Sequence, residues 1–185
     1  MKVQRKSVDG RDVAVFDDLM ALEEAKSYFN ALTQASFTRT EVAKRELGEF
    51  RHWVCETPLE NLPRLSLWPL TQQAVAHVRP SESYQPYRAY TNHASFGDML
   101  FTHFDALPGA RELTALWYLC DLWDVEWGGE TLFFDAEGDA QAVVSPKPGR
   151  LVLFDGAIRH VGRAPNRICT TPRYTFAIKL RLSAR

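Results

Sequence analysis

The chain has 185 residues, enough for one domain with a sizeable core, and its 45% apolar and 24% charged residues are an ordinary globular composition. A formal net charge of −1 gives no reason to expect a nucleic acid or an anionic membrane as the main partner. The sequence has no run of about 18 apolar residues and starts with a polar stretch, so we expect a cytoplasmic protein without a membrane span or secretory signal. The three cysteines have no metal-type spacing and are expected to be reduced thiols.

The first half of the chain contains two helix patterns and two strand patterns. Apolar residues recur at steps of three and four in 18–32 and in 66–78, which is typical of amphipathic helices. Asp18 is expected to cap the first of them, since a side-chain oxygen there can accept from a free backbone N–H. The stretches 11–16 and 50–56 are predicted to be strands.

From about residue 84, short runs of aromatic and β-branched residues alternate with turn residues. We predict strands over 86–91, 100–105, 113–119, 131–135, 140–145, 150–155 and 173–182. Many short strands separated by turns are typical of a β-barrel or a two-sheet jelly roll. The predicted fold is therefore α+β but mainly β, in one domain over residues 1–185. A helical and strand support region (1–83) places its helices on the outside of a jelly-roll core (84–182).

The predicted strand 100–105 carries two metal-ligand residues, His103 and Asp105. Alternate residues of a strand point the same way, and a buried carboxylate without a partner is costly. A divalent cation bound by the imidazole and the carboxylate removes that cost, and His160, just beyond the strand 150–155, is the candidate third ligand. Two histidines and one carboxylate leave three metal positions open, as in non-haem Fe(II) oxygenases. The remaining histidines, interpreted as structural or surface residues, are His52, His77 and His93.

The start of the last predicted strand carries an anion-binding pair. Arg173 and Thr175 share one face, and a guanidinium matches a carboxylate with two parallel hydrogen bonds. An arginine buried beside a metal requires an anionic partner. The far carboxylate of 2-oxoglutarate fits this requirement while its keto acid end chelates iron. The alternative is a surface arginine at a strand edge.

The stretch from about Tyr87 to Leu182 resembles the Fe(II)/2-oxoglutarate-dependent dioxygenases, and within them the prolyl hydroxylase branch. The resemblance rests on His-x-Asp, the distant histidine and Arg-x-Thr, together with several longer pieces in the same order. These pieces are 113-LTALWYLCDLWD-124, 128-GGETLFF-134, 146-PKPGRLVLF-154 and 173-RYTFAIKL-180.

The resemblance implies a double-stranded β-helix fold and a complete site. His103, Asp105 and His160 would hold Fe(II), and Arg173 would bind the C5 carboxylate of 2-oxoglutarate. Further pocket residues implied by the match, beside Thr175, are Tyr118, Tyr90, Thr114 and Leu116. The implied reaction consumes 2-oxoglutarate and O₂, releases succinate and CO₂, and hydroxylates an unactivated C–H bond; ascorbate is a further candidate cofactor. A carboxylate at position 105 favours hydroxylation, desaturation or ring formation over halogenation.

The substrate-facing side departs from the oxygen-sensing prolyl hydroxylases. Leu100 and Lys179 stand where those enzymes carry a tyrosine and a tryptophan, and the loop with Arg163 and Arg167 is longer. The substrate therefore stays open between a peptidyl proline, a free amino acid and a small natural-product intermediate. One hypothesis is that Arg163 or Arg167 meets an acidic group of the substrate. The oligomeric state is not indicated.

Two other classes of protein account for part of this pattern. A zinc or manganese hydrolase or isomerase would use the two histidines and the aspartate, but would leave Arg173 and Thr175 without a task. A barrel-shaped binding or sensor domain would explain the aromatic residues but not the metal ligands. The oxygenase hypothesis explains both features.

Overall fold

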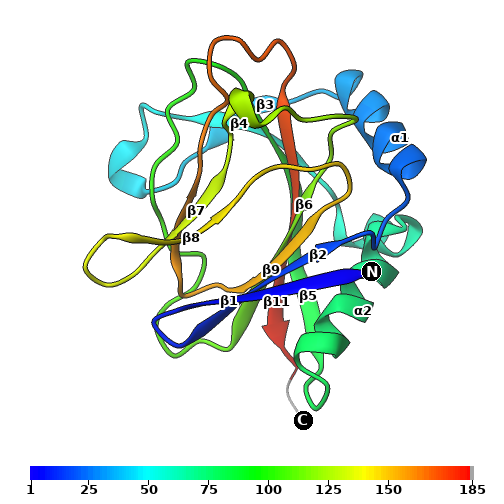
Figure 1. The fold of residues 1–185 in the computed structure, drawn as a ribbon, viewed down its shortest axis with the longest axis vertical. Helices are drawn as coiled ribbons and strands as arrows, with labels where there is room; N and C mark the ends of the chain where they lie inside the picture. Colours follow the sequence, from blue (N-terminus) through cyan, green and yellow to red (C-terminus); the bar gives the residue numbers. More distant parts are fainter. Residues whose placement is uncertain (184–185) are drawn as a thin grey trace.

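Two antiparallel β-sheets face each other, and both α-helices lie on the far side of the larger sheet (Figure 1). The computed structural model describes residues 1–183. Its elements are β1 (Lys2–Val8), β2 (Arg11–Asp17), α1 (Leu22–Thr33), β3 (Thr38–Glu41), η1 (Arg45–Leu47), β4 (His52–Glu56), η2 (Leu59–Arg64), α2 (Leu67–Val78), β5 (Tyr84–Ala94), β6 (Glu112–Tyr118), η3 (Val125–Trp127), β7 (Thr131–Phe134), β8 (Ala140–Val144), β9 (Leu151–Asp155), β10 (Arg159–Gly162) and β11 (Arg173–Leu182). This arrangement confirms the mainly β, jelly-roll prediction.

The larger sheet has eight strands in the order β1-β2-β9-β6-β11-β5-β4-β3, and the smaller has β10-β7-β8. Strand β11 lies between β5 and β6 and is buried along most of its length. Strands from the first 83 residues form both edges of the larger sheet. The N-terminal region thus extends the sheet as well as supplying helices.

The period-two alternation of strand side chains gives the larger sheet two different faces. On β6, Trp117 points to the helices, whereas Tyr118 points to the smaller sheet. On β11, Phe176 joins the helix-side core and Ala177 the core between the sheets. The face between the sheets is therefore the interior surface on which a site can form.

Helix α2 begins and ends close to the predicted limits, but α1 does not. Asp18 has a left-handed backbone conformation (φ 58°) and α1 begins at Leu22 after Ala21, with no side-chain cap. The predicted Asp18 cap is wrong, because the chain turns before the helix starts. Helix α2 is fixed to the sheet by the Trp117 indole N–H, which donates to the Thr71 hydroxyl at 2.9 Å.

The strand predicted over 100–105 is also wrong. This segment is irregular, apart from an isolated antiparallel bridge between His103 and His160. Three observed strands were not predicted: β1, β3 and β10. All are short or mostly polar, and β1 and β3 are sheet edges with one open side, so their sequences lack the apolar alternation of central strands. In residues 1–183, no helix combines the length and apolar character needed to cross a membrane.

Candidate metal centre

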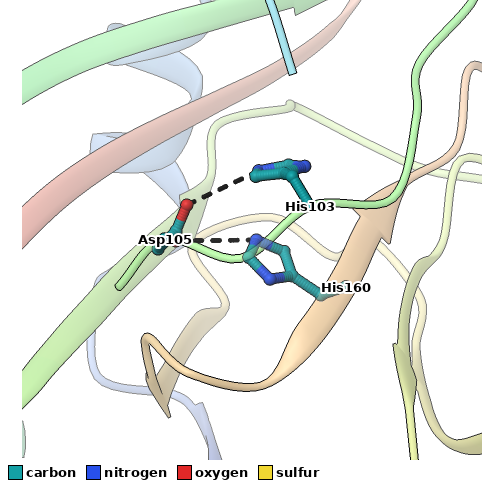
Figure 2. Close-up of side chains that lie close together, drawn as sticks. All are labelled: His103, Asp105 and His160. Atoms are coloured by element: carbon teal, nitrogen blue, oxygen red, sulfur yellow. Dashed lines mark ion pairs between the residues drawn. The ribbon is translucent and has the colours of Figure 1, made fainter. Parts of the chain in front are cut away.

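His103, Asp105 and His160 converge between the two sheets (Figure 2). One ligand atom from each residue lies within 4.8 Å of the other two. The Nε2 atoms of His103 and His160 are each 3.5 Å from a different carboxylate oxygen of Asp105. Three potential ligands from two chain segments that face a common point can hold one cation.

Backbone pairing, rather than alternation along one strand, brings the three side chains together. His103 and His160 exchange two backbone hydrogen bonds of 3.0 Å, so the two imidazoles lie side by side with ring centroids 4.4 Å apart. The backbone N–H of Asp105 donates to the Gly156 carbonyl at 2.9 Å. These bonds fix the irregular segment next to β10 without making it a strand.

Each imidazole is oriented by a backbone carbonyl. Nδ1 of His103 lies 3.0 Å from the carbonyl oxygen of Phe101, and Nδ1 of His160 lies 2.9 Å from that of Ile158. A carbonyl can only accept, so Nδ1 of each ring carries the proton and Nε2 keeps its lone pair. Nε2 is the atom that faces Asp105, which is the tautomer required for metal binding.

The ionisation states also suit a metal centre. Burial lowers the pKa of His160 to about 4, so its ring is neutral near pH 7. Burial alone would raise the pKa of Asp105, but the ammonium of Lys179 and the two imidazoles hold it well below its usual range. The centre therefore presents a neutral imidazole and a carboxylate without a prior proton release.

Asp105 has two further partners, Thr114 on β6 and Lys179 on β11. The Thr114 hydroxyl donates to Oδ2 of Asp105 at 2.6 Å, and the Lys179 ammonium forms an ion pair with the same oxygen. Burial opposes the charged ammonium, but the Asp105 carboxylate outweighs it and raises the pKa of Lys179. A lysine so close to a candidate metal ligand was not predicted. The only sign of it in the sequence was that Lys179 stands where the oxygen-sensing prolyl hydroxylases carry a tryptophan.

The second candidate group is Arg173, which is 3% exposed at the other end of the same cavity. Its guanidinium donates to the carbonyl of Gly129 at 2.6 Å and to the hydroxyls of Thr131 at 2.9 Å and Thr175 at 3.4 Å. All three acceptors are neutral. Arginine stays protonated in proteins, and Arg173 forms no ion pair with a carboxylate of residues 1–183, so this buried charge favours a bound anion.

The walls around Arg173 are made of an aromatic ring, a hydroxyl and glycines. The guanidinium lies over the ring of Tyr118, 5.2 Å from its centroid, and the Tyr118 hydroxyl is 2.6 Å from that of Thr131. A Cβ atom on Gly162 would come within 3.0 Å of the guanidinium. Gly162 thus leaves the space that the arginine fills. Thr131 was not identified from the sequence, because a threonine in a short strand carries no distinctive signal.

The cavity between the metal triad and Arg173 is lined by all the metal-ligand and 2-oxoglutarate residues expected from the sequence except Tyr118, which lies beneath Arg173. The residues that line it include Tyr90, Thr114, Leu116, Thr175, Leu100 and Lys179. His52 and His93, both interpreted from the sequence as structural or surface residues, line it too, as does Asn92. In residues 1–183, Nδ1 of His52 and Oδ1 of Asn92 are buried and make no hydrogen bond. Arg163 and Arg167 are exposed on the loop between β10 and β11, outside this lining.

The donor set fits ferrous iron and a keto dicarboxylate. Two imidazoles and one carboxylate form the ligand set that non-haem Fe(II) sites use, and it leaves coordination positions open. Arg173 offers a buried cation with neutral neighbours for a distal carboxylate. The residues present can therefore hold both groups in one cavity.

Sequence comparison gives one family. The model of the 2OG-Fe(II) oxygenase superfamily matches residues 87–179, half of the chain. A comparison with curated proteins finds no match.

Comparison with solved structures finds the same fold at low sequence identity. A prolyl-4-hydroxylase from Pseudomonas putida has a TM-score of 0.67 at 15% identity, with 93% of each chain covered. A prolyl hydroxylase from Trichoplax adhaerens was solved with a hypoxia inducible factor peptide fragment. It has a TM-score of 0.66 at 17% identity, and the match covers 92% of this chain and 82% of the Trichoplax chain. HygX from Streptomyces hygroscopicus, solved with nickel and 2-oxoglutarate bound, has a TM-score of 0.65 at 14% identity, with 91% and 82% covered.

Proposed function

The chain belongs to the 2OG-Fe(II) oxygenase superfamily, and on that premise we propose that it hydroxylates an unactivated C–H bond of a prolyl or amino-acid-like substrate, with release of succinate and CO₂. The observation that carries the proposal is one cavity lined by both the His103–Asp105–His160 cluster and the buried Arg173. A hydrolytic metal site would have no use for the second group.

In this proposal the three clustered side chains hold the iron, and each protein group has a defined task. When bound, Fe(II) supplies the activation of O₂ that couples decarboxylation of 2-oxoglutarate to C–H hydroxylation. The carbonyls of Phe101 and Ile158 keep the imidazoles in the metal-binding tautomer. Thr114 orients the Asp105 carboxylate through its 2.6 Å hydrogen bond.

Arg173 binds the distal carboxylate of 2-oxoglutarate and so directs its keto acid end toward the iron. Thr131 and Thr175 hold the guanidinium, and Tyr118 covers one of its faces. Leu116 and Ala177 form apolar walls that limit water between the two ends of the cavity. A buried guanidinium that forms no ion pair with the described residues binds an anion more strongly than an exposed one does.

The substrate enters, in this proposal, past His52 and Asn92. Both line the cavity with a buried polar atom that has no partner among the described residues, and such atoms favour a ligand with hydrogen-bonding groups. A polar amino acid or peptide meets this requirement. An apolar natural product would leave both atoms unpaired.

Anaerobic loading with Fe(II) and 2-oxoglutarate, followed by O₂, tests the proposal directly. We expect succinate release that increases with one member of a panel of free amino acids and proline peptides. His103→Ala should abolish it, because the metal loses a ligand. Arg173→Met should raise the 2-oxoglutarate concentration needed, while Co(II) binding stays as in the wild type. If Arg173→Met instead lost metal binding and needed no more 2-oxoglutarate than the wild type, the role of Arg173 would be refuted.

A further inference from the structure

The lining of the cavity carries an excess of positive charge, to which Lys179 contributes. The charged side chains that line the cavity are Asp105, Lys179 and Arg173, one anion and two cations. The nearby carboxylate of Glu41 is already paired with Arg88 at 2.7 Å. Within the lining, only Asp105 balances Lys179.

The position of Lys179 is built into the sheet. Like Arg173, Thr175 and Ala177, it points between the sheets, and its side chain is 8% exposed. The pairing of β11 with β5 shifts by one residue directly after Lys179, where Pro86 has no N–H to offer the ladder. Such irregularities re-aim side chains next to sites. The ammonium is held by the Asp105 carboxylate, lies 3.3 Å from the Thr114 hydroxyl, and sits 5.8 Å from the Tyr90 ring centroid.

A bound divalent cation changes the balance around this ammonium. Asp105 would then share its single negative charge between the metal and Lys179. If 2-oxoglutarate gives its distal carboxylate to Arg173, that carboxylate is unavailable at the Lys179 end. A buried ammonium with a shared counter-ion favours a second anion beside it.

We propose that Lys179 binds a carboxylate next to the metal centre, an inference that rests on the proposed function. The carboxylate is either the keto acid end of 2-oxoglutarate or an acidic group of the substrate. In both cases Lys179 is a binding residue of the cavity and not only the counter-ion of Asp105.

The test compares Lys179→Met, which keeps the length of the side chain, with Lys179→Arg, which keeps its charge. Arg181→Met is the matched control, because it removes a cation from the same strand at an exposed position. Each full-length protein is loaded with Co(II), and its stoichiometry and visible spectrum are recorded first. Ligands are then titrated: 2-oxoglutarate, 2-oxopentanoate without the distal carboxylate, and acetate in the presence of saturating 2-oxoglutarate.

If the keto acid is the ligand, Lys179→Met should weaken 2-oxoglutarate and 2-oxopentanoate by about tenfold each, as expected for one charge-assisted hydrogen bond. If the substrate is the source, both affinities stay unchanged and acetate binding is lost only in Lys179→Met. In either case Lys179→Arg restores binding and Arg181→Met behaves as wild type. The inference is overturned if Lys179→Met binds both keto acids as the wild type does, and if acetate binds to neither of these two proteins or equally to both. Failure of the wild type to bind Co(II) and 2-oxoglutarate would instead refute the proposed function.

Discussion

At the scale of single residues, the candidate centre depends on groups that hold the ligands as much as on the ligands themselves. Oδ2 of Asp105 accepts from Thr114 and pairs with Lys179, so the carboxylate has one preferred orientation. The histidines are fixed in the same way through Nδ1. Such outer contacts set ligand geometry and basicity.

Thr114→Val should weaken metal binding by roughly tenfold, because removal of a partner of a metal ligand typically has an effect of that size. The change is nearly isosteric and removes the hydroxyl that donates to Asp105. Isothermal titration of Co(II) into the metal-free protein measures the affinity. Thr114→Ser is the control, since it keeps the hydroxyl and should bind Co(II) as the wild type does. Equal affinities of the valine and serine variants would show that the hydroxyl does not support Asp105.

At the scale of elements, the short strand β10 links the two ends of the cavity. His160 and Gly162 are alternate residues of this strand, so both face the interior. His160 contributes to the metal cluster, and Gly162 leaves space for Arg173. Four residues thus couple the candidate metal ligand to the candidate anion site.

Gly162→Ala should weaken 2-oxoglutarate binding by roughly tenfold, since overpacking costs about 1–3 kcal/mol and tenfold in affinity is about 1.4 kcal/mol. The added Cβ would lie 3.0 Å from Nη2 of Arg173 and 3.1 Å from Nη1. Co(II) affinity should not change. Gly48→Ala, whose Cβ would meet its nearest neighbour at an ordinary 3.6 Å, is the control. A Gly162→Ala protein with wild-type 2-oxoglutarate affinity would mean that the guanidinium can move freely.

At the scale of the whole molecule, the stack of helices, large sheet and small sheet partly buries His93, a cavity-lining histidine that is not a candidate metal ligand. His93 on β5 packs on the helix side between the rings of Phe37, Trp53 and Tyr174. Burial lowers the pKa of His93 below its usual value. His93 therefore binds a proton less readily in the folded protein than in the unfolded chain.

The free energy of unfolding should fall as the pH is lowered below about 6.5, where unfolded histidine takes up its proton. One such group contributes at most about 1.4 kcal/mol per pH unit. His93→Phe, which keeps an aromatic ring among its neighbours, should reduce this slope. Urea unfolding of the metal-free protein from pH 8 to pH 5 gives the two curves. Parallel curves for wild type and variant would contradict the assignment to His93.

The sequence alone determined the mainly β fold, the outer helices and the residue types of the candidate site. That information lay in apolar strand patterns such as 113–119 and in the residue types at four positions, His103, Asp105, His160 and Arg173. Both can be read from the sequence because side-chain chemistry and strand periodicity are local properties. The resemblance to a known family supported the expected iron and 2-oxoglutarate and added the other pocket residues, and the family match agrees with the resemblance.

Only the tertiary structure decided how these residues meet. The segment 100–105 is irregular, and an isolated antiparallel bridge to His160, not strand alternation, positions His103. The contact of Lys179 with Asp105 joins positions remote in sequence, and that of Gly162 with Arg173 joins two strands that belong to different sheets. No local pattern encodes such pairs, because they arise from the register between strands and from the packing of one sheet on the other.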